Sequence, residues 1–376
     1  MTRRRAAILA LVALPAWLPV VAEAGPPASS PSPREALPAE VARLAADYAE
    51  ATGAKVGVHA VALPGGDRLC GLHEDRPLIP ASNQKIPTTA VALARLGADF
   101  EFRTALAVSG DDLVVLGDGD PTTGDPVLAA ESGRDIYAVF DAWAAAAAKA
   151  GIEKVAGNLI IRPGVFRGGV HPDWPENQRQ RWYSAPACGV NFNDNCLEVG
   201  FKVAGGKVRP VVSPASRYLR IVNEVTLGRR HVWSCRFDES GRRVTLRGTV
   251  KRSTPDPWPV AVPDPAELFA AVLADRFARA GIPLAGRIVI DRRPNGKRPP
   301  PQTPGILAVE RTSLAAAVGR ANKRSLNLAS ECLLLRSASR PGERVGWKEA
   351  AELAEAVLTE RHGLAEDSFT VADGSG

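Results

Sequence analysis

The chain has 376 residues, with 47 lysines and arginines against 41 aspartates and glutamates and a formal net charge of +6. This length exceeds one ordinary domain, so we expect two domains or one domain with a large insertion. The basic residues are scattered rather than clustered with aromatic residues, which argues against nucleic acid as a partner, whereas a mildly basic surface suits an anionic wall or envelope polymer.

The N-terminus has the three parts of a secretory signal peptide. Three arginines at positions 3–5 precede an apolar stretch over residues 6–21, and the small-x-small sequence AEA follows it. Two prolines interrupt the apolar stretch, which favours cleavage over a retained membrane helix. We therefore expect residues 1–24 to be removed, leaving a protein of the periplasm or cell exterior with no stable membrane anchor.

Residues 37–72 open the mature chain with a helix and two strands. Apolar residues recur at helical spacing over residues 37–51, residues 55–61 alternate like a strand, and a Gly-Gly turn precedes a second strand over residues 68–72. A further helix begins near Ser82, at the start of an apolar run. This order of elements predicts an α/β fold.

Residues 105–303 follow a different pattern, in which short β-like runs are separated by Gly, Pro and Asp. The predicted strands are residues 113–116, 159–161, 219–225 and 243–250, and the predicted helices are residues 137–149 and 266–280. The basic, proline-rich residues 292–304 predict a connector.

The last part of the chain returns to a mixed pattern. We expect a short strand over residues 306–309, a helix from about Ser313 and a long amphipathic helix over residues 347–362. No internal repeat is found, so the chain is not a repeat protein.

The cysteines and histidines give no metal-binding pattern. The five cysteines form no C-x-x-C pair and the five histidines lack HExxH or HxxxH spacing, so we predict no metal and no cofactor. An odd number of cysteines in an exported protein leaves at least one unpaired within the chain. The sequence GDGDP over residues 117–121 lacks the later glutamate of an EF-hand and the G-K-[ST] of a phosphate loop, and we interpret it as a turn after a strand.

Ser82 and Lys85 form the only S-x-x-K in the chain. A serine hydroxyl is a weak nucleophile unless a neighbouring base accepts its proton, and three-residue spacing on a helix places both side chains on one face. The lysine can be that base only if burial lowers its pKa, and the apolar neighbours Ile86, Val91 and Leu93 favour burial. The alternative is that Ser82 only caps the helix.

Ser325-Leu326-Asn327 is the only S-x-N in the chain and lies between two helical segments. A short loop at this place can present both polar side chains to a cleft. The Ser325 hydroxyl could relay the proton between Lys85 and a leaving amine, and the Asn327 amide could hold a substrate amide. The alternative is a polar turn whose Ser or Asn caps the helix over residues 328–335.

Five segments, in this order along the chain, carry a resemblance to a known family. They are IPASNQKIPTTAVAL (79–93), LVVLGDGDPT (113–122), YSAPACGVNFNDNC (183–196), NKRSLNLASE (322–331) and DGSG (373–376). Together with the S-x-x-K and S-x-N pair, they resemble the D-alanyl-D-alanine carboxypeptidase/endopeptidase family, the class C low-molecular-mass penicillin-binding proteins. The similarity runs from about residue 35 to the last residue.

The resemblance implies a serine β-lactamase/DD-peptidase-like transpeptidase domain that is split by a large, mostly β insertion. Residues 25–104 and 304–376 would form the transpeptidase domain, and residues 105–303 would form the insertion. Cysteines in some relatives also suggest a bridge between Cys196 and Cys235.

The resemblance also implies the chemistry of the site. The implied roles are acylated nucleophile for Ser82, general base for Lys85, proton relay for Ser325 and substrate holder for Asn327. The implied substrates are peptidoglycan stem peptides, cleaved through an acyl-serine intermediate, with β-lactams as inhibitors that are trapped on the same serine.

Two features depart from the family's pattern. The middle residue of S-x-N is often Asp in the wider group and is Leu326 here, which leaves the two reacting positions intact. No K-[ST]-G tripeptide occurs in the 376 residues, so we expect either a chain truncated before this motif or a protein without this wall of the cleft. The second case keeps open a non-catalytic peptidoglycan-binding or interaction protein.

Overall fold

The computed structural model describes residues 33–293, 305–340 and 344–376. The predicted signal peptide and most of the predicted connector lie outside these residues. No helix in the described ranges is long and apolar enough to cross a membrane. The chain divides into two compact units, the first ending at Ile79 and the second beginning at Pro80.

The N-terminal unit contains one helix and one hairpin. Helix α1 (Pro33–Thr52) contacts strand β2 (Arg68–Leu72), which pairs antiparallel with strand β1 (Val58–Val61). Gly65 and Gly66 both have positive φ in the turn between the strands, a conformation that glycine adopts at little cost. The predicted helix, hairpin and Gly-Gly turn are therefore confirmed.

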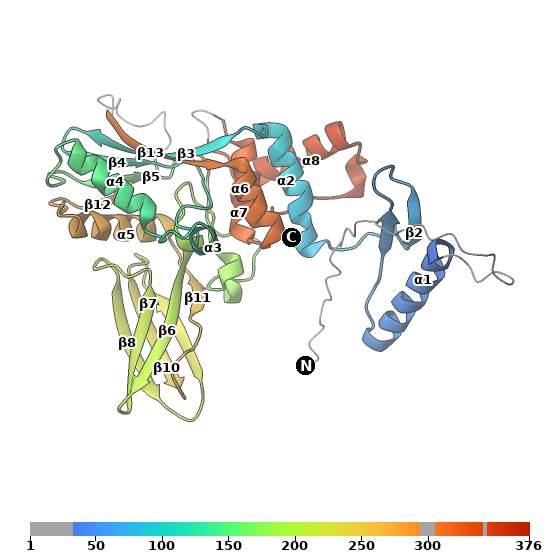
Figure 1. Ribbon diagram of the computed structural model, residues 1–376, viewed down its shortest axis with the longest axis horizontal. Helices are drawn as coiled ribbons and strands as arrows, with labels where there is room; N and C mark the ends of the chain where they lie inside the picture. The colour runs from blue at the N-terminus through green and yellow to red at the C-terminus, as the bar shows by residue number, and fades with distance from the viewer. Residues whose placement is uncertain (1–32, 294–304, 341–343) are drawn as a thin grey trace, which may run out of the picture. The chain divides into compact units, whose positions relative to one another are not determined.

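A five-stranded mixed sheet lies in the C-terminal unit, with strand order β12-β5-β4-β3-β13 (Figure 1). Its strands are β3 (Glu101–Ser109), β4 (Asp112–Leu116), β5 (Leu159–Arg162), β12 (Ile288–Ile290) and β13 (Gly305–Ser313). β4, β5 and β12 run parallel to one another, and β3 is antiparallel to both β4 and β13. The predicted boundary between residues 104 and 105 lies inside β3, so the sheet contains strands from both sides of it.

Two helices, α4 (Ala138–Lys149) and α5 (Pro265–Arg279), pack on this sheet through a shared apolar core. Phe140 of α4 is stacked on Phe192 and lies edge-on to Phe269 of α5, with ring centroids 4.7 and 4.8 Å apart. Both helices lie within one residue of their predicted bounds. The short helix α3 (Pro126–Glu131) follows the GDGDP sequence and is capped by Asp125.

Two three-stranded sheets form a β-sandwich that projects from the five-stranded sheet (Figure 1). One sheet has the order β11-β6-β7 and the other β8-β10-β9. Their strands are β6 (Cys196–Ala204), β7 (Lys207–Ser213), β8 (Arg220–Leu227), β9 (Val232–Phe237), β10 (Arg243–Val250) and β11 (Trp258–Ala261). Phe201 and Trp233 meet edge to face between the sheets at 5.2 Å, and the sandwich shares its core with the five-stranded sheet.

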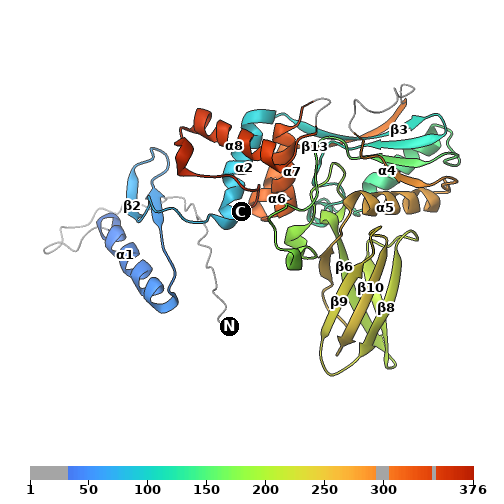
Figure 2. The same cartoon turned by 180° about the vertical axis from the view of Figure 1, so that it is seen from behind.

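A layer of four helices completes the unit (Figure 2). They are α2 (Lys85–Leu96), α6 (Leu314–Lys323), α7 (Asn327–Ala338) and α8 (Trp347–His362). Helix α7 is buried along almost its whole length, because α2, α6 and α8 all contact it. The helix predicted over residues 347–362 is confirmed at both ends. Strands, sheets and helices together confirm the α/β fold class.

Candidate active site

Ser82 lies in a 3₁₀ turn, Ala81–Gln84, that leads directly into α2, and Lys85 is the first residue of that helix. Lys85 Nζ donates a hydrogen bond to Ser82 Oγ at 3.2 Å. No side chain caps either the turn or α2, so the interpretation of Ser82 as a helix cap is wrong. Ala81 has a φ of 45°, an uncommon conformation for a non-glycine residue, immediately before the serine.

Lys85 is almost completely buried, with 1% of its surface exposed. Of the three neighbours expected to bury it, Val91 is buried but Ile86 and Leu93 are 57% and 44% exposed, so the predicted source of burial is wrong for those two. Helix α7 and the last residues of the chain cover the lysine instead, and its Nζ also donates to the Ser375 carbonyl at 3.3 Å. Burial lowers the pKa of Lys85, since an ammonium without water is unfavourable.

Glu331 is a buried carboxyl beside Lys85, and neither of the two short motifs contains it. It lies on α7, is fully buried and accepts a hydrogen bond from the Gly374 N–H at 2.9 Å. Burial, aided by the negative charge of Asp373, raises its pKa to about 8. At neutral pH this carboxyl therefore keeps its proton in most molecules and offers Lys85 only a weak counter-charge. An acid inside the apolar run LASECLLL was the available sequence signal.

Residues 373–376, the DGSG segment, form a tight turn against the serine. Asp373 Oδ1 accepts hydrogen bonds from the N–H groups of Ser375 and Gly376 at 3.0 and 2.6 Å, and Thr88 Oγ1 of α2 donates to the Gly374 carbonyl at 2.8 Å. A Cβ at Gly374 would lie 2.6 Å from the Ser330 carbonyl oxygen, so only glycine fits there without a shift. Gly374 thus links α2 to α7, because its carbonyl accepts from Thr88 and its N–H donates to Glu331.

Trp174 holds the same turn from another side. Its indole N–H donates to Asp373 Oδ2 at 2.7 Å. The neighbouring His171 is buried and lies edge-on to Trp347 of α8, with ring centroids 5.1 Å apart. The aromatic loop around Trp174 therefore positions the DGSG turn through a hydrogen bond as well as by packing.

Ser325 and Asn327 lie at the junction of α6 and α7. Ser325 is half-buried with a φ of 55°, and Asn327 is the first residue of α7, where its Nδ2 donates to the Tyr183 carbonyl at 2.9 Å. Neither residue caps α7, whose N-cap is Leu326 without a side-chain hydrogen bond, so that alternative is wrong.

The S-x-N junction approaches α2 through Asn322. Asn322 Nδ2 donates to Thr89 Oγ1 at 3.0 Å, and Thr89 lies one helical turn after Lys85. Within the described ranges, no hydrogen bond joins Ser325 to Ser82 or Lys85. The structure thus brings Ser82 and Lys85 into contact and places the S-x-N junction beside the same helix, while the relay role of Ser325 stays a prediction.

The GDGDP segment is held by a buried carboxylate. Asp120 accepts hydrogen bonds from the hydroxyls of Thr122 and Thr312 at 2.7 and 2.6 Å, and burial raises its pKa. Residues 117–121 directly follow β4 as predicted, but they form an irregular loop, and the turn itself lies at residues 123–124. Among the described residues, no group of three or more His, Cys, Asp or Glu side chains is placed to hold a metal ion.

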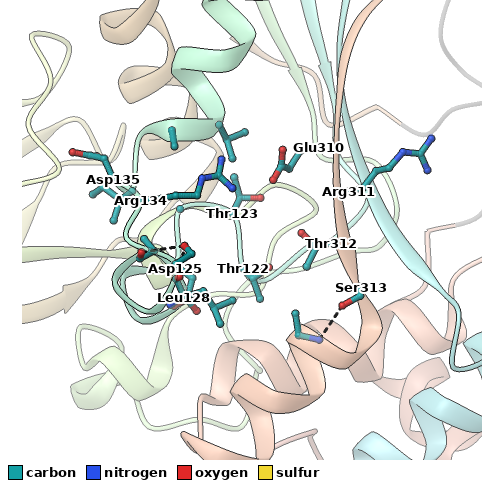
Figure 3. A pocket seen from close by; sticks show the side chains of 17 residues that line it. Thr122, Thr123, Asp125, Leu128, Arg134, Asp135, Glu310, Arg311, Thr312 and Ser313 are labelled. Atoms are coloured by element: carbon teal, nitrogen blue, oxygen red, sulfur yellow. Dashed lines mark hydrogen bonds between the residues drawn. The ribbon is translucent and has the colours of Figure 1, made fainter.

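A separate cavity of about 300 Å³ lies beside this turn (Figure 3). Arg134 reaches it from the loop before α4 and Glu310 from β13, where burial raises the Glu310 pKa. The Ser313 hydroxyl at its edge accepts a hydrogen bond from the Ala316 N–H and caps α6. None of the four predicted site residues lines this cavity.

All five cysteines are buried free thiols. The bridge suggested between Cys196 and Cys235 is therefore wrong, because the two lie in different sheets of the sandwich and are not bonded. Burial raises the pKa of Cys235 to about 12 and that of Cys188 to about 11, which makes both thiols poor nucleophiles at neutral pH.

The D-Ala-D-Ala carboxypeptidase 3 (S13) family matches residues 37–376 of the chain. A D-alanyl-D-alanine carboxypeptidase of Actinomadura sp. (strain R39) is 33% identical over 194 residues, 47% of this chain and 34% of that protein. The D-alanyl-D-alanine carboxypeptidase DacB of Haemophilus influenzae is 23% identical over 311 residues, 80% of this chain and 62% of that protein. The match therefore spans about a third of one relative and 62% of the other.

Two solved structures share the fold. Penicillin binding protein 4 (dacB) from Haemophilus influenzae superposes with a TM-score of 0.69 at 20% identity, covering 88% of this chain and 73% of that one. The same protein complexed with a novel β-lactam gives a TM-score of 0.62 at 20% identity, covering 85% of this chain and 69% of that one. At this level of identity the similarity shows the fold.

Proposed function

The chain belongs to the D-Ala-D-Ala carboxypeptidase 3 (S13) family, and from this premise we propose that it is a serine-type D-Ala-D-Ala carboxypeptidase or endopeptidase acting on peptidoglycan stem peptides. The observation that carries the proposal is the 3.2 Å contact between Lys85 Nζ and Ser82 Oγ, made by a lysine that is 1% exposed. A buried amine with a lowered pKa can accept the serine proton at neutral pH, which an exposed lysine cannot do efficiently.

The proposed reaction has two halves. In the first, neutral Lys85 accepts the Ser82 proton while Ser82 Oγ bonds to the carbonyl carbon of the penultimate D-Ala, and the C–N bond breaks. Ser325 relays a proton to the leaving amine, and Asn327 holds the amide of the stem peptide. In the second half, water attacks the acyl-serine ester, the serine regains its proton and the shortened peptide leaves.

The surroundings of Lys85 support this proton transfer. Its pKa is set by opposing effects, of which burial is the largest, while the negative charges of Glu331 and Asp373 act in the other direction. Because the Glu331 pKa is about 8, that carboxyl is largely neutral at pH 7 and burial prevails. We therefore propose that Glu331 is a positioning residue that acts through Lys85 by setting the pKa of its amine.

β-Lactams are proposed inhibitors that acylate the same serine. The β-lactam complex of the Haemophilus influenzae protein, which shares the fold, supports this proposal. We also propose that the chain is exported and acts in the periplasm or at the cell exterior, and that residues 25–104 and 304–376 form its transpeptidase part with residues 105–303 inserted.

Labelling with a fluorescent penicillin tests the proposal. We expect stoichiometric label on the chain, mapped by peptide mass to Ser82, and none on Ser82→Ala. Ser368→Ala, at an exposed serine in the same unit, is the matched control and should label like the unmodified chain. Label on any other residue would overturn the assignment. An unlabelled, folded chain that still binds peptidoglycan would favour the alternative of a non-catalytic binding protein.

A further inference from the structure

A cavity of about 630 Å³ lies on the β-sandwich, where the chain leaves β10 and returns to β11. The returning segment runs along β6, since Ser253 Oγ accepts from the Val203 N–H and the Thr254 N–H donates to the Phe201 carbonyl. His231, the residue directly before β9, lines the same cavity. The β8–β9 connection and the segment between β10 and β11 therefore form one hollow, which we call the β10-end cavity.

Trp258 presents an exposed aromatic ring in this cavity. Its side chain is 58% exposed, although its backbone is fixed by pairing with Val199 of β6. Pro257 and Pro259 flank it and restrict the backbone on both sides. A large apolar side chain exposed to water on a fixed backbone is typical of a binding surface, because little backbone entropy is lost when a ligand packs on it.

Positive charge surrounds this tryptophan. Lys251 and Arg252 line the β10-end cavity, and Arg229 and Arg230 directly precede His231 in the turn before β9. All four are exposed, and none pairs with a carboxylate within the part of the chain that the structure describes. The cavity lining itself contains one acidic residue, Asp256. Unpaired cations of this kind attract an anionic polymer and add to its rate of association.

We propose that the β10-end cavity binds the glycan strand of peptidoglycan, with the face of a sugar ring on Trp258 and a carboxylate of the attached lactyl or peptide group beside Lys251 and Arg252. This rests on the proposed function only for the identity of the polymer. The combination of one exposed aromatic ring with cations fits a carboxylated sugar, whereas sequence-tolerant binding of single-stranded nucleic acid uses several aromatic side chains for successive bases. The cavity would hold the enzyme on the polymer while another part of the strand reaches Ser82.

Cosedimentation of the full chain with purified peptidoglycan sacculi, stripped of phosphate-containing polymers by acid, tests the proposal. We expect Trp258→Ala to weaken binding by at least about tenfold, as truncation of a central tryptophan does at protein interfaces, and Trp258→Phe to retain part of the affinity. Lys251→Gln/Arg252→Gln should weaken binding mainly at low ionic strength. The matched control is Arg236→Gln/Arg243→Gln, which removes two exposed charges from the opposite end of the β9–β10 pair, about 23 Å away along the strand.

Each outcome decides for or against the proposal. Unchanged binding by Trp258→Ala, an equal loss in the control pair, sedimentation only with sacculi that keep their phosphate polymers, or preference for single-stranded DNA would overturn it. Thermal melting of each variant by circular dichroism shows that it is folded. Penicillin labelling is measured on the same preparations: label without Trp258-dependent binding refutes this inference alone, and Trp258-dependent binding without label refutes the proposed catalytic function alone.

Discussion

The two regions of greatest interest use the same kinds of side chain in opposite surroundings. At the candidate active site, Lys85 is 1% exposed and contacts a serine, whereas Lys251 in the β10-end cavity is exposed and has no ion-pair partner among the described residues. The tryptophans also differ, because one is partly buried and hydrogen-bonded and the other is exposed. Trp174 donates its N–H to Asp373 at 2.7 Å, whereas Trp258 is 58% exposed. Burial makes a lysine a candidate base, and exposure leaves it a candidate anchor for a polyanion.

The largest expected change is in the rate of penicillin acylation when Lys85 is replaced, and it tests whether this buried lysine acts as a base. Lys85→Met should reduce the rate constant of penicillin acylation by about 10³-fold, within the range of a lost general base. Lys85→Arg should fail similarly, because a guanidinium stays protonated. Stopped-flow or gel-based labelling measures the rate. Lys348→Met, at an exposed lysine of α8, is the control and should label normally. Full activity in Lys85→Arg would show that the site needs a positive charge and not a neutral amine. Lys85 would then not be the base, and its burial would not explain its role.

The next effect concerns the stability of the buried carboxyl. The Glu331 pKa is about 8 in the folded protein, against a reference value of 4.5. A raised pKa means that the folded state gains stability from the protonated form below pH 4.5 and loses it as the pH rises toward 8. We expect this group to lower the free energy of unfolding by roughly 4 kcal/mol between these limits.

Glu331→Gln isolates this contribution. Urea unfolding at pH 5 and at pH 8 should show a much smaller pH dependence in the variant than in the unmodified chain. Glu352→Gln, at an exposed position of α8, should leave the dependence unchanged. Equal pH dependence of the unfolding free energy in the unmodified chain and in Glu331→Gln would mean that the carboxyl titrates normally and that water reaches the region around Lys85.

A smaller effect is expected on the pH profile of acylation. The active lysine is neutral, so the rate should rise with pH through a midpoint below 10.5, the ordinary value for lysine. The negative charge of Glu331 raises the Lys85 pKa, so Glu331→Gln should move this midpoint to lower pH. Because Glu331 carries this charge mainly above its pKa of about 8, the rate should increase only above pH 8, by up to about tenfold for each unit of the shift, and should change little at pH 7. A midpoint that moves upward would contradict the proposed tuning role.

The smallest effect on stability and acylation is expected from substitutions in the β10-end cavity. Lys251→Gln/Arg252→Gln should change the free energy of unfolding by less than about 0.5 kcal/mol, because solvated side chains without partners contribute little to folding. Acylation of Ser82 should be unaffected. Chemical unfolding and penicillin labelling measure both quantities. A destabilisation comparable to that of a core substitution would show that these cations support the fold.

Features that depend on residues close together in the sequence were predicted correctly. The three-residue spacing of Ser82 and Lys85 placed the two side chains in contact, and the helix over residues 347–362 was confirmed at both ends. The family resemblance was confirmed by the match over residues 37–376. These features depend on neighbours along the chain or on ordered motifs, which a single sequence displays directly.

Contacts between distant segments were not predictable in the same way. Glu331 reaches the lysine region only because α7 packs against α2, and Ser375 accepts from Lys85 across 290 positions of sequence. The burial expected for Lys85 is confirmed, but Ile86 and Leu93, the neighbours expected to provide it, are exposed, since apolar character does not reveal which helix face is covered. The Cys196–Cys235 bridge failed because resemblance to relatives gives no distance between two thiols.

The attachment of the β-sandwich has a further consequence. The chain enters it at Cys196 and leaves it at Ala261, and these two residues are directly paired between β6 and β11. Partners in an antiparallel ladder have Cα atoms about 5 Å apart, so a few residues suffice to rejoin the chain at this point. The sandwich is therefore one insertion whose two ends meet, but its apolar core is continuous with that of the five-stranded sheet, so a shorter insertion would need other apolar side chains to cover the exposed part of that core.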